Sequence, residues 1–218
     1  MPRIVRTVVI LTALLLAAVA QAATPESLRV TADATTVTVS GVTPGESVVV
    51  FCVTRETRNY VHLLRRHQAV VVDGERAGKI TYQPPDGIAA ESIIAAVEIG
   101  SGRIAVGSRP EVAPRELGED AGHGFGRGIN GELNRLQKRG QFCELLVVRP
   151  GTGAWTMKVG DGGQADRDHS SDHAVTIDVD ELLPVEGAAA ATPKQFRPGD
   201  VVFGVETHEF AYFVAGVR

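Results

Sequence analysis

The residues best suited to chemistry lie in one polar stretch, residues 161–173. Oxygen-bearing side chains occupy every second position in part of it, as in the first half of a calcium-binding loop. An EF-hand is excluded, because Ser171 stands where that loop has glycine and Ile177 where it has glutamate. A solvated acidic loop is the simpler interpretation, and a less regular calcium site stays open. The alternating residues are Asp166, Asp168, Ser170 and Asp172.

The same stretch contains two histidines that suggest a different metal chemistry. His169, Asp172 and His173 belong to His-Ser-Ser-Asp-His, which resembles the His-x-x-Glu-His signature of inverted zinc peptidases with aspartate in place of glutamate. The resemblance implies two zinc-binding histidines on one helix face, with the acid as general base. Glycines at 162–163 and the Val/Ile run after the motif disfavour that helix. A metal-dependent hydrolase at these residues is therefore the alternative hypothesis.

Other catalytic templates are absent from the sequence. There is no Gly-x-Ser-x-Gly nucleophile elbow, no phosphate-binding loop and no Cys-x-x-Cys motif. Residues 126–131 match Gly-x-Gly-x-x-Gly, but a dinucleotide-binding fingerprint must follow a strand, and acidic, glycine-rich residues precede this one. We therefore assign no catalytic residue, and no cofactor beyond the open question of calcium.

Two cysteines, Cys52 and Cys143, each lie in an apolar, strand-like run. In an oxidising compartment they can form a disulfide, which would tie the two halves of the chain together. The alternative is that each is a small buried hydrophobic residue that never meets the other. The sequence leaves both interpretations open.

The sequence also contains a local cluster of cations and a set of aromatic residues. We interpret the cations as a solvated strand and loop face, with binding of an acidic partner or polysaccharide as the alternative. We interpret the aromatic residues as a second core, with a glycan-binding platform as the alternative. The cations are Arg55, Arg58, His62, Arg65, Arg66 and His67, and the aromatic residues are Trp155, Phe203, Phe210, Tyr212 and Phe213.

The N-terminus has the layout of a cleavable signal peptide. Arg3 and Arg6 precede an apolar run over residues 10–19, and Ala20-Gln21-Ala22 supplies small residues for cleavage. We predict a signal peptide over residues 1–22 and a periplasmic or secreted mature protein. Without Arg3 and Arg6, 20 basic residues remain against 26 acidic ones, which disfavours nucleic acid as a partner. No later apolar run is long enough to span a membrane.

Short alternating runs bounded by turn residues recur along the chain, which predicts β-strands. Strands and the turns between them must therefore position the residues described above. Residues 36–50 combine Thr/Val alternation, a Pro-Gly turn and a Val-rich run, and they resemble the opening of bacterial exported immunoglobulin-like and fibronectin type III-like modules. The resemblance covers residues 28–108 and implies a β-sandwich, a fold that hosts many unrelated functions. The strands predicted in this part are 28–31, 36–40, 47–54, 67–72, 79–83, 92–98 and 104–106.

A second β-rich part follows a segment whose glycines, at every second position of residues 122–128, predict a linker. Residues 132–139 fit either a helix or a strand. The strands predicted beyond them are 141–148, 154–159, 175–179, 201–205 and 210–217. We therefore predict an all-β protein with two β-domains. The predicted divisions are an immunoglobulin-like sandwich over 23–110, a Gly/acidic linker over 111–130 and a smaller antiparallel β-domain over 131–218.

Together these observations favour a non-catalytic exported module with a binding, adhesion or accessory role. Its predicted ligand is a protein or a polysaccharide of unknown identity. The alternative is the metal-dependent hydrolase centred on His169, Asp172 and His173. A hydrolase needs these histidines ordered beside a concave pocket, whereas a binding module does not.

Overall fold

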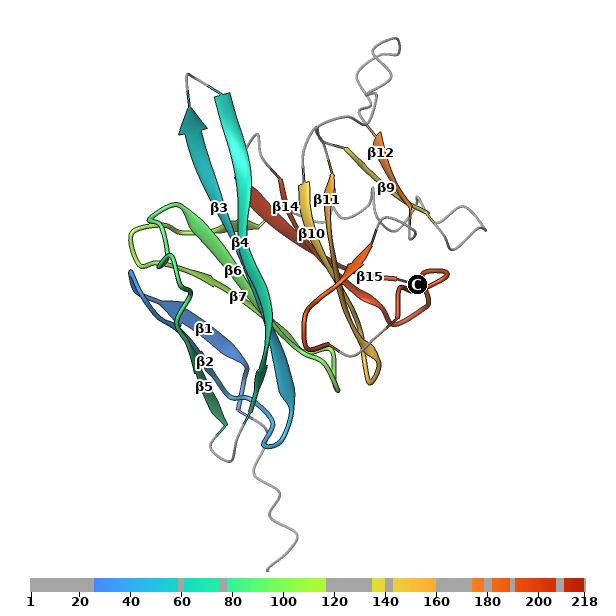
Figure 1. Ribbon diagram of the computed structural model, residues 1–218, viewed down its shortest axis with the longest axis horizontal. Coiled ribbons are helices and arrows are strands. Elements are labelled where there is room, and N and C mark those ends of the chain that lie inside the picture. The colour runs from blue at the N-terminus through green and yellow to red at the C-terminus, as the bar shows by residue number, and fades with distance from the viewer. Residues whose placement is uncertain are drawn as a thin grey trace, which may run out of the picture.

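The computed structural model describes residues 26–58, 61–74, 78–116, 135–139, 143–159, 174–178, 182–188, 191–206 and 210–217. All regular elements among these residues are β-strands, so the predicted all-β class is confirmed (Figure 1). The described part contains no helix that is long and apolar enough to cross a membrane. Its strands form three sheets, which we name A, B and C, and one separate pair.

Sheets A and B contain the strands of the first half of the chain, and all their pairings are antiparallel. Sheet A has the order β1-β2-β5 and sheet B the order β4-β3-β6-β7. The turn at Gly100-Ser101-Gly102 joins β6 to β7. The bounds are β1 (Arg29–Ala32), β2 (Val37–Ser40), β3 (Ser47–Arg58), β4 (Val61–Asp73), β5 (Lys79–Tyr82), β6 (Ser92–Glu98) and β7 (Ile104–Ser108).

Sheet C is built mainly from the second half of the chain, in the order β13-β11-β10-β14-β15-β8. Its pairings are antiparallel except that between β15 and β8, which is parallel. Strands β9 and β12 pair separately. The bounds are β8 (Arg115–Glu116), β9 (Arg135–Arg139), β10 (Cys143–Arg149), β11 (Gly153–Val159), β12 (Ala174–Asp178), β13 (Leu183–Pro184), β14 (Val201–Glu206) and β15 (Ala211–Gly216).

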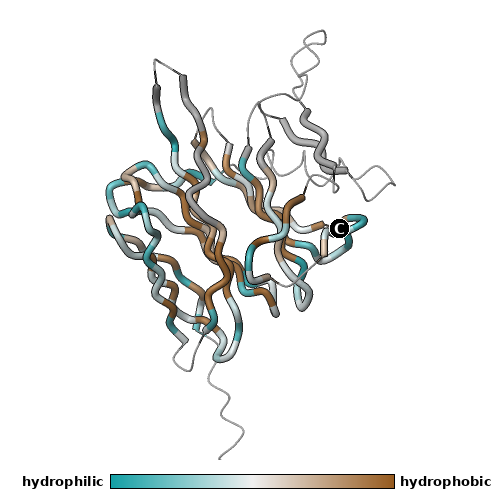
Figure 2. The backbone as a smooth tube through the Cα atoms, in the orientation of Figure 1, coloured by the Kyte–Doolittle hydropathy of each residue, from teal (hydrophilic) through white to brown (hydrophobic). Residues whose placement is uncertain are grey.

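Sheet B is the middle layer and is buried on both faces. In β3, Val48 and Val50 pack against sheet A, whereas Val49 and Phe51 pack against sheet C. Every residue of β6 is buried, which explains why this strand reads as a continuous apolar run and lacks alternation. Figure 2 shows the hydrophobic segments concentrated along this central layer.

The outer face of sheet C has a core of its own. Trp155 and Phe213 on the sheet pack with Leu182, Phe196 and Val217, which lie outside the long strands. These segments fold back over the sheet and shield its second apolar face from water. The second half therefore builds its own core from coil as well as from strands.

Most predicted strands are present within one or two residues. In the segment that fitted either a helix or a strand, residues Arg135–Arg139 form β9. The hairpin of β3 and β4 is longer than predicted, and the two-residue strands β8 and β13 were not predicted. Both differences arise from pairing between strands, which cannot be inferred from the residue pattern of one strand alone.

The two halves of the chain share one apolar layer. Phe51 of sheet B and Phe203 of sheet C meet edge to face, with ring centroids 5.9 Å apart. At one end of this layer the N–H of Gly151 donates to the carbonyl of Ile99 at 2.8 Å. Most of the predicted linker lies outside the described residues, and separate folding of the two predicted domains stays a prediction.

Candidate functional site

The predicted metal-binding stretch lies outside the described residues. Asp166, Asp168, His169, Asp172 and His173 all fall between β11 and β12, in residues 160–173. Among the residues that the structure does describe, no group of three or more His, Cys, Asp or Glu side chains could hold a metal ion. The calcium site and the zinc hydrolase therefore stay predictions.

The predicted cation cluster lies on the hairpin of β3 and β4. Strand β6 pairs with β3 from Val48 only as far as Thr54. Beyond that point β3 pairs with β4 alone, up to the pair Arg58 and Val61. We name residues 54–58 and 61–65 the outer arm. Figure 1 shows β3 and β4 extending past the end of β6, and β4 is an edge strand of sheet B.

The register of the hairpin distributes the arginines over both faces of the outer arm. Residues directly opposite each other in an antiparallel pair share a face. Val53 and Leu64 pack in the core shared with sheet C, so their opposite positions, Arg66 and Arg55, lie on that face. The pairs Thr54–Arg65 and Arg58–Val61 lie on the other face. The register shift next to Val53 gives β4 one extra residue, His67, which is a β-bulge.

Arg55 fixes the base of the outer arm. Its Nε and Nη2 donate to the two carboxylate oxygens of Glu91 at 3.0 and 3.3 Å. The guanidinium carbon lies 4.9 Å from the centroid of the Phe210 ring, so the arm is also held against sheet C by a cation–π contact. Phe210 has a positive φ of 49°, an uncommon backbone conformation for a bulky residue. Arg55 therefore belongs to the scaffold and not to the open surface.

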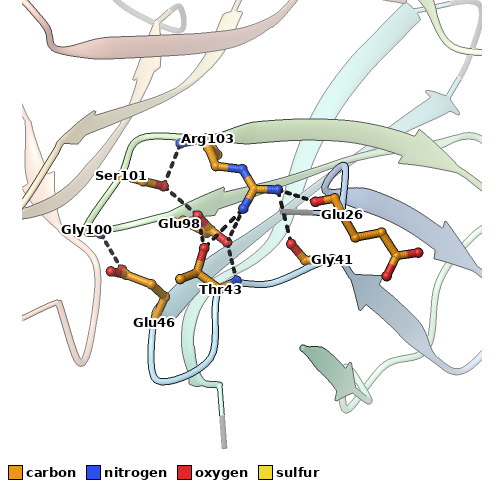
Figure 3. Close-up of polar contacts among 8 residues, drawn as sticks. All are labelled: Glu26, Gly41, Thr43, Glu46, Glu98, Gly100, Ser101 and Arg103. Carbon is orange, nitrogen blue, oxygen red and sulfur yellow. Dashed lines mark hydrogen bonds and ion pairs between the residues drawn. The ribbon is translucent and has the colours of Figure 1, made fainter. Parts of the chain in front are cut away.

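A second polar cluster, drawn in Figure 3, surrounds Glu98 at the end of β6. Its side chain is fully buried. Its Oε1 accepts hydrogen bonds from the backbone N–H of Thr43 at 2.7 Å and from Nη1 of Arg103 at 3.3 Å. Its Oε2 accepts from the hydroxyls of Thr43 and Ser101. Both carboxylate oxygens of Glu98 thus accept hydrogen bonds from groups within the fold.

Arg103 extends this cluster to the start of sheet A. Its Nη2 donates to the carbonyl oxygens of Glu26 at 2.7 Å and Gly41 at 3.1 Å. Glu46 adds a further link, because its carboxylate accepts the N–H of Gly100 at 2.9 Å. Figure 3 shows these contacts joining the β2–β3 turn to the β6–β7 turn. The cluster therefore joins sheets A and B at one end and is structural.

Arg149 and Asp200 make a comparable link in the second half. Nε and Nη2 of Arg149 each donate to a different carboxylate oxygen of Asp200 at 2.8 Å. Asp200 is buried and also accepts the backbone N–H of Arg197 at 2.9 Å. These bonds raise the pKa of Arg149 above its usual value. The guanidinium lies 5.6 Å from the ring centre of Trp155, so the pair holds the 191–200 segment over the outer core.

The predicted aromatic residues lie in the core but do not form one second core, because Trp155 and Phe213 belong to the outer core of sheet C whereas Phe203 and Phe210 belong to the core shared with sheet B. Trp155, Phe203, Phe210 and Phe213 are all buried. Tyr212 is half-buried, stacks on Phe203 and donates its hydroxyl to Glu116 at 3.4 Å. Loss of solvation and then the nearby Glu116 carboxylate raise the pKa of Tyr212. These contacts leave the four buried rings unavailable as a glycan platform.

Cys52 is a free, buried thiol on the face of β3 that packs against sheet A. That face is turned away from sheet C, to which β10 and Cys143 belong. Burial raises the pKa of the Cys52 thiol to about 11, although a hydrogen bond with Ser92 acts in the opposite direction. The structure thus places Cys52 in the core, the side chain of Cys143 lies outside the described residues, and whether the two cysteines pair stays a prediction.

Comparison with known proteins gives no family for this chain. No protein-family model matches it, and no curated protein matches it significantly.

Sequence reasoning missed the Glu98 and Asp200 clusters. One available signal was the charged residue that ends the apolar run of β6, and another was the acid that closes the Arg-Pro-Gly-Asp turn at 197–200.

Proposed function

We propose that this protein is an exported, non-catalytic binding module that contacts its ligand through the outer arm. One observation carries the proposal: β3 and β4 continue together beyond Thr54, where their pairing with the rest of sheet B ends. This extension carries the ribbon of β3 and β4 past the rest of sheet B, and Arg55 anchors its base to Glu91. Binding residues are often placed on such projections.

An immunoglobulin-like or fibronectin type III-like sandwich is our interpretation of the scaffold. Sheets A and B hold seven antiparallel strands around a common core, which supports it. In an immunoglobulin constant domain the fourth strand joins the sheet of the first, second and fifth strands. Here β4 pairs with β3 instead, and this exchange is what gives sheet B its long edge hairpin.

Export to the periplasm or the medium is part of the proposal. The signal-peptide pattern over residues 1–22 supports it. Mass spectrometry of the protein recovered outside the cytoplasm should find an N-terminus at Ala23 or Thr24. A chain that keeps Met1 and stays in the cytoplasm would contradict export.

Binding is tested by shortening the outer arm. Residues 56–63 are replaced by Asn-Gly, so that Arg55 and Leu64, which already face each other, flank a two-residue turn. Both proteins are applied to an array of purified bacterial envelope polysaccharides and exported proteins. We expect saturable binding by the intact chain and binding weaker by about tenfold or more after shortening, a loss of about 1.4 kcal/mol.

Two readouts complete this test. Thermal unfolding must show that the shortened chain is still folded. We expect it to fold because it retains both Arg55 and Leu64. Equal binding by both proteins would contradict a role for the outer arm. Consumption of an array polymer would identify a hydrolase, and failure of the intact chain to bind any component would contradict the binding function itself.

A further inference from the structure

Strand β4 is an edge of sheet B, and its last residues lack the features that usually protect a sheet edge (Figure 1). A free edge attracts other strands, so folded proteins shorten it, cover it, or place Pro, Lys or a β-bulge on it. The β-bulge of β4 lies at His67, near the middle of its thirteen residues. Beyond it, residues 69–72 read Ala-Val-Val-Val, and all four are half-buried. We name residues 69–73 the open edge.

The other edges of sheets A, B and C are each protected. Strands β1 and β7 cover one another, because a Cβ placed on Gly107 would lie 2.5 Å from the carbonyl oxygen of Val30. Sheet C ends in the two-residue strands β8 and β13, and β13 contains Pro184. The four-residue edge strand β5 begins with the exposed Lys79. The open edge is therefore the exception among these three sheets.

The hydrogen bonds of β3 show which backbone groups of the open edge point outward. In an antiparallel pair the N–H and C=O of one residue point to the same side, and the side alternates along the strand. The N–H of Ile99 donates to the carbonyl of Ser47 at 2.9 Å, so Ser47 bonds toward β6. Its opposite residue, Asp73, therefore points away from β3, and so do Val71 and Ala69. No strand in the described part of the chain pairs with these outward groups.

We infer that the open edge pairs with the open edge of a second copy of this chain, antiparallel and about a two-fold axis at Val71. Val71 then lies opposite Val71 of the second copy, and Ala69 lies opposite its Asp73. Each such pair exchanges two backbone hydrogen bonds. The two four-stranded B sheets join into one continuous sheet. This inference goes beyond the proposed function and does not depend on it.

The side chains of the open edge complement themselves in this register. Val70 lies opposite Val72 of the second copy, on the face that packs against sheet A. Val71 meets its own counterpart on the face that packs against sheet C. Opposed β-branched side chains are favourable cross-strand pairs. Pairing therefore extends both apolar layers of sheet B across the two-fold axis and removes half-buried valines from water.

Charge selects the same register. Asp73 is the one ionisable residue of the open edge, and it lies opposite Ala69. The two Asp73 residues are then separated by about 14 Å along the strands, beyond the screening length of about 8 Å. A shift of two residues in one direction brings them to about 7 Å. A shift in the other direction places Asp73 opposite His67, where the bulge disrupts the ladder.

Sedimentation velocity of the mature exported chain tests the pairing. We expect a reversible dimer whose population rises with protein concentration between about 1 and 500 µM. Val71→Pro removes an N–H that points outward, which an edge strand tolerates, so the folded variant should dimerise about tenfold or more weakly. Val71→Thr keeps the N–H and the branched shape and should dimerise as the parent does. Val72→Pro should lower the Tm more than Val71→Pro, because the N–H of Val72 faces β3.

Engineered disulfides test the register without proline. In a C52A/C143S background, Val71→Cys should form a disulfide between two copies, because residues of a hydrogen-bonded pair have Cα atoms about 5.5 Å apart. Asp73→Cys is the matched control: position 73 is exposed, but its two copies lie too far apart to cross-link. The A69C/D73C variant should cross-link again, since these positions lie opposite each other. Non-reducing gel electrophoresis distinguishes the three variants.

Three outcomes would overturn the inference. A chain that stays monomeric over the whole concentration range does not pair through this edge. A dimer that Val71→Pro leaves unchanged uses another surface. Cross-linking of Asp73→Cys as efficient as that of Val71→Cys would reflect random collision and would contradict the two-fold register.

Discussion

The buried carboxylate of Glu98 gives the most direct test of what holds sheets A and B together. Glu98→Gln keeps the shape of the side chain but replaces one acceptor oxygen with an NH₂ group that faces donors. The carboxylate accepts four hydrogen bonds, two at each oxygen, so the substitution removes two of them. At about 1.5 kcal/mol for each bond to a charged group, we expect a loss of about 3 kcal/mol.

This value lies at the lower end of the range of about 3–5 kcal/mol that is typical for breaking a buried ion pair. The lower end applies because the partner, Arg103, keeps 29% of its side chain exposed and can be rehydrated. In a chain of this size, 3 kcal/mol corresponds to a fall in Tm of about 6–12 °C. Urea and thermal unfolding, followed by far-UV circular dichroism and tryptophan fluorescence, measure both quantities.

A neighbouring acid provides the control. Glu46 belongs to the same cluster but is only half-buried and accepts the N–H of Gly100. Glu46→Gln should therefore cost less than about 1 kcal/mol. In a double-mutant cycle, Arg103→Met should recover part of the loss in Glu98→Gln, because it removes the unpaired cation. If Glu98→Gln destabilises no more than Glu46→Gln, the reasoning about the buried network is wrong.

Three other expectations concern the second half and the shared core. Asp200→Asn should lower the free energy of unfolding by about 3 kcal/mol, because it leaves the partly buried Arg149 without its counter-charge. Phe203→Ala should cost about 3–5 kcal/mol and shift the unfolding of both halves together, because Phe203 packs against Phe51. The thiol of Cys52 should react with Ellman's reagent at pH 8 roughly a hundredfold more slowly than in the unfolded chain, from its smaller thiolate fraction alone. Its pKa is higher in the folded state, about 11 against an ordinary 9.0, so this thiol lowers stability only as the pH rises above 9.0.

Each expectation has its own control. Glu111→Gln removes an exposed partner of Arg109 and should change stability by less than about 0.5 kcal/mol, in contrast to Asp200→Asn. Separate transitions of fluorescence and circular dichroism in Phe203→Ala would contradict a shared core. The thiol assay uses Cys143→Ser, so that Cys52 alone reports. Rapid reaction of the folded variant would mean that Cys52 is accessible.

Local patterns in the sequence were sufficient to predict most strands. The Thr/Val alternation of β2 corresponds directly to its burial, with Val37 and Val39 inside and Thr38 and Ser40 half-exposed. Such alternation depends only on neighbours along one strand, so it can be read without knowledge of the fold. The aromatic residues of the second half were correctly assigned to the core, because large apolar side chains in a chain with few of them are buried, but their division between two cores was not predicted.

The candidate binding surface was only partly predictable. The cluster of arginines was visible, but the run from Arg55 to Arg58 lacks apolar alternation and was not predicted as a strand. Pairing with β4 makes it one, and the register places Arg58 and Arg65 on one face. Cross-strand register is a property of two segments together, and the polar end of a hairpin contains little information about it.

The sequence by itself determined the all-β class, most of the strands and the export signal pattern. The tertiary structure decided that sheet B is enclosed by two other sheets, that Cys52 faces sheet A and that the buried carboxylates of Glu98 and Asp200 each accept a hydrogen bond from a residue distant in the chain. Glu98 meets Thr43 across 55 positions, and Arg149 meets Asp200 across 51. Strand formation follows from short-range patterns of polarity, whereas sheet stacking and these long-range hydrogen bonds depend on which segments meet after the chain has closed long loops.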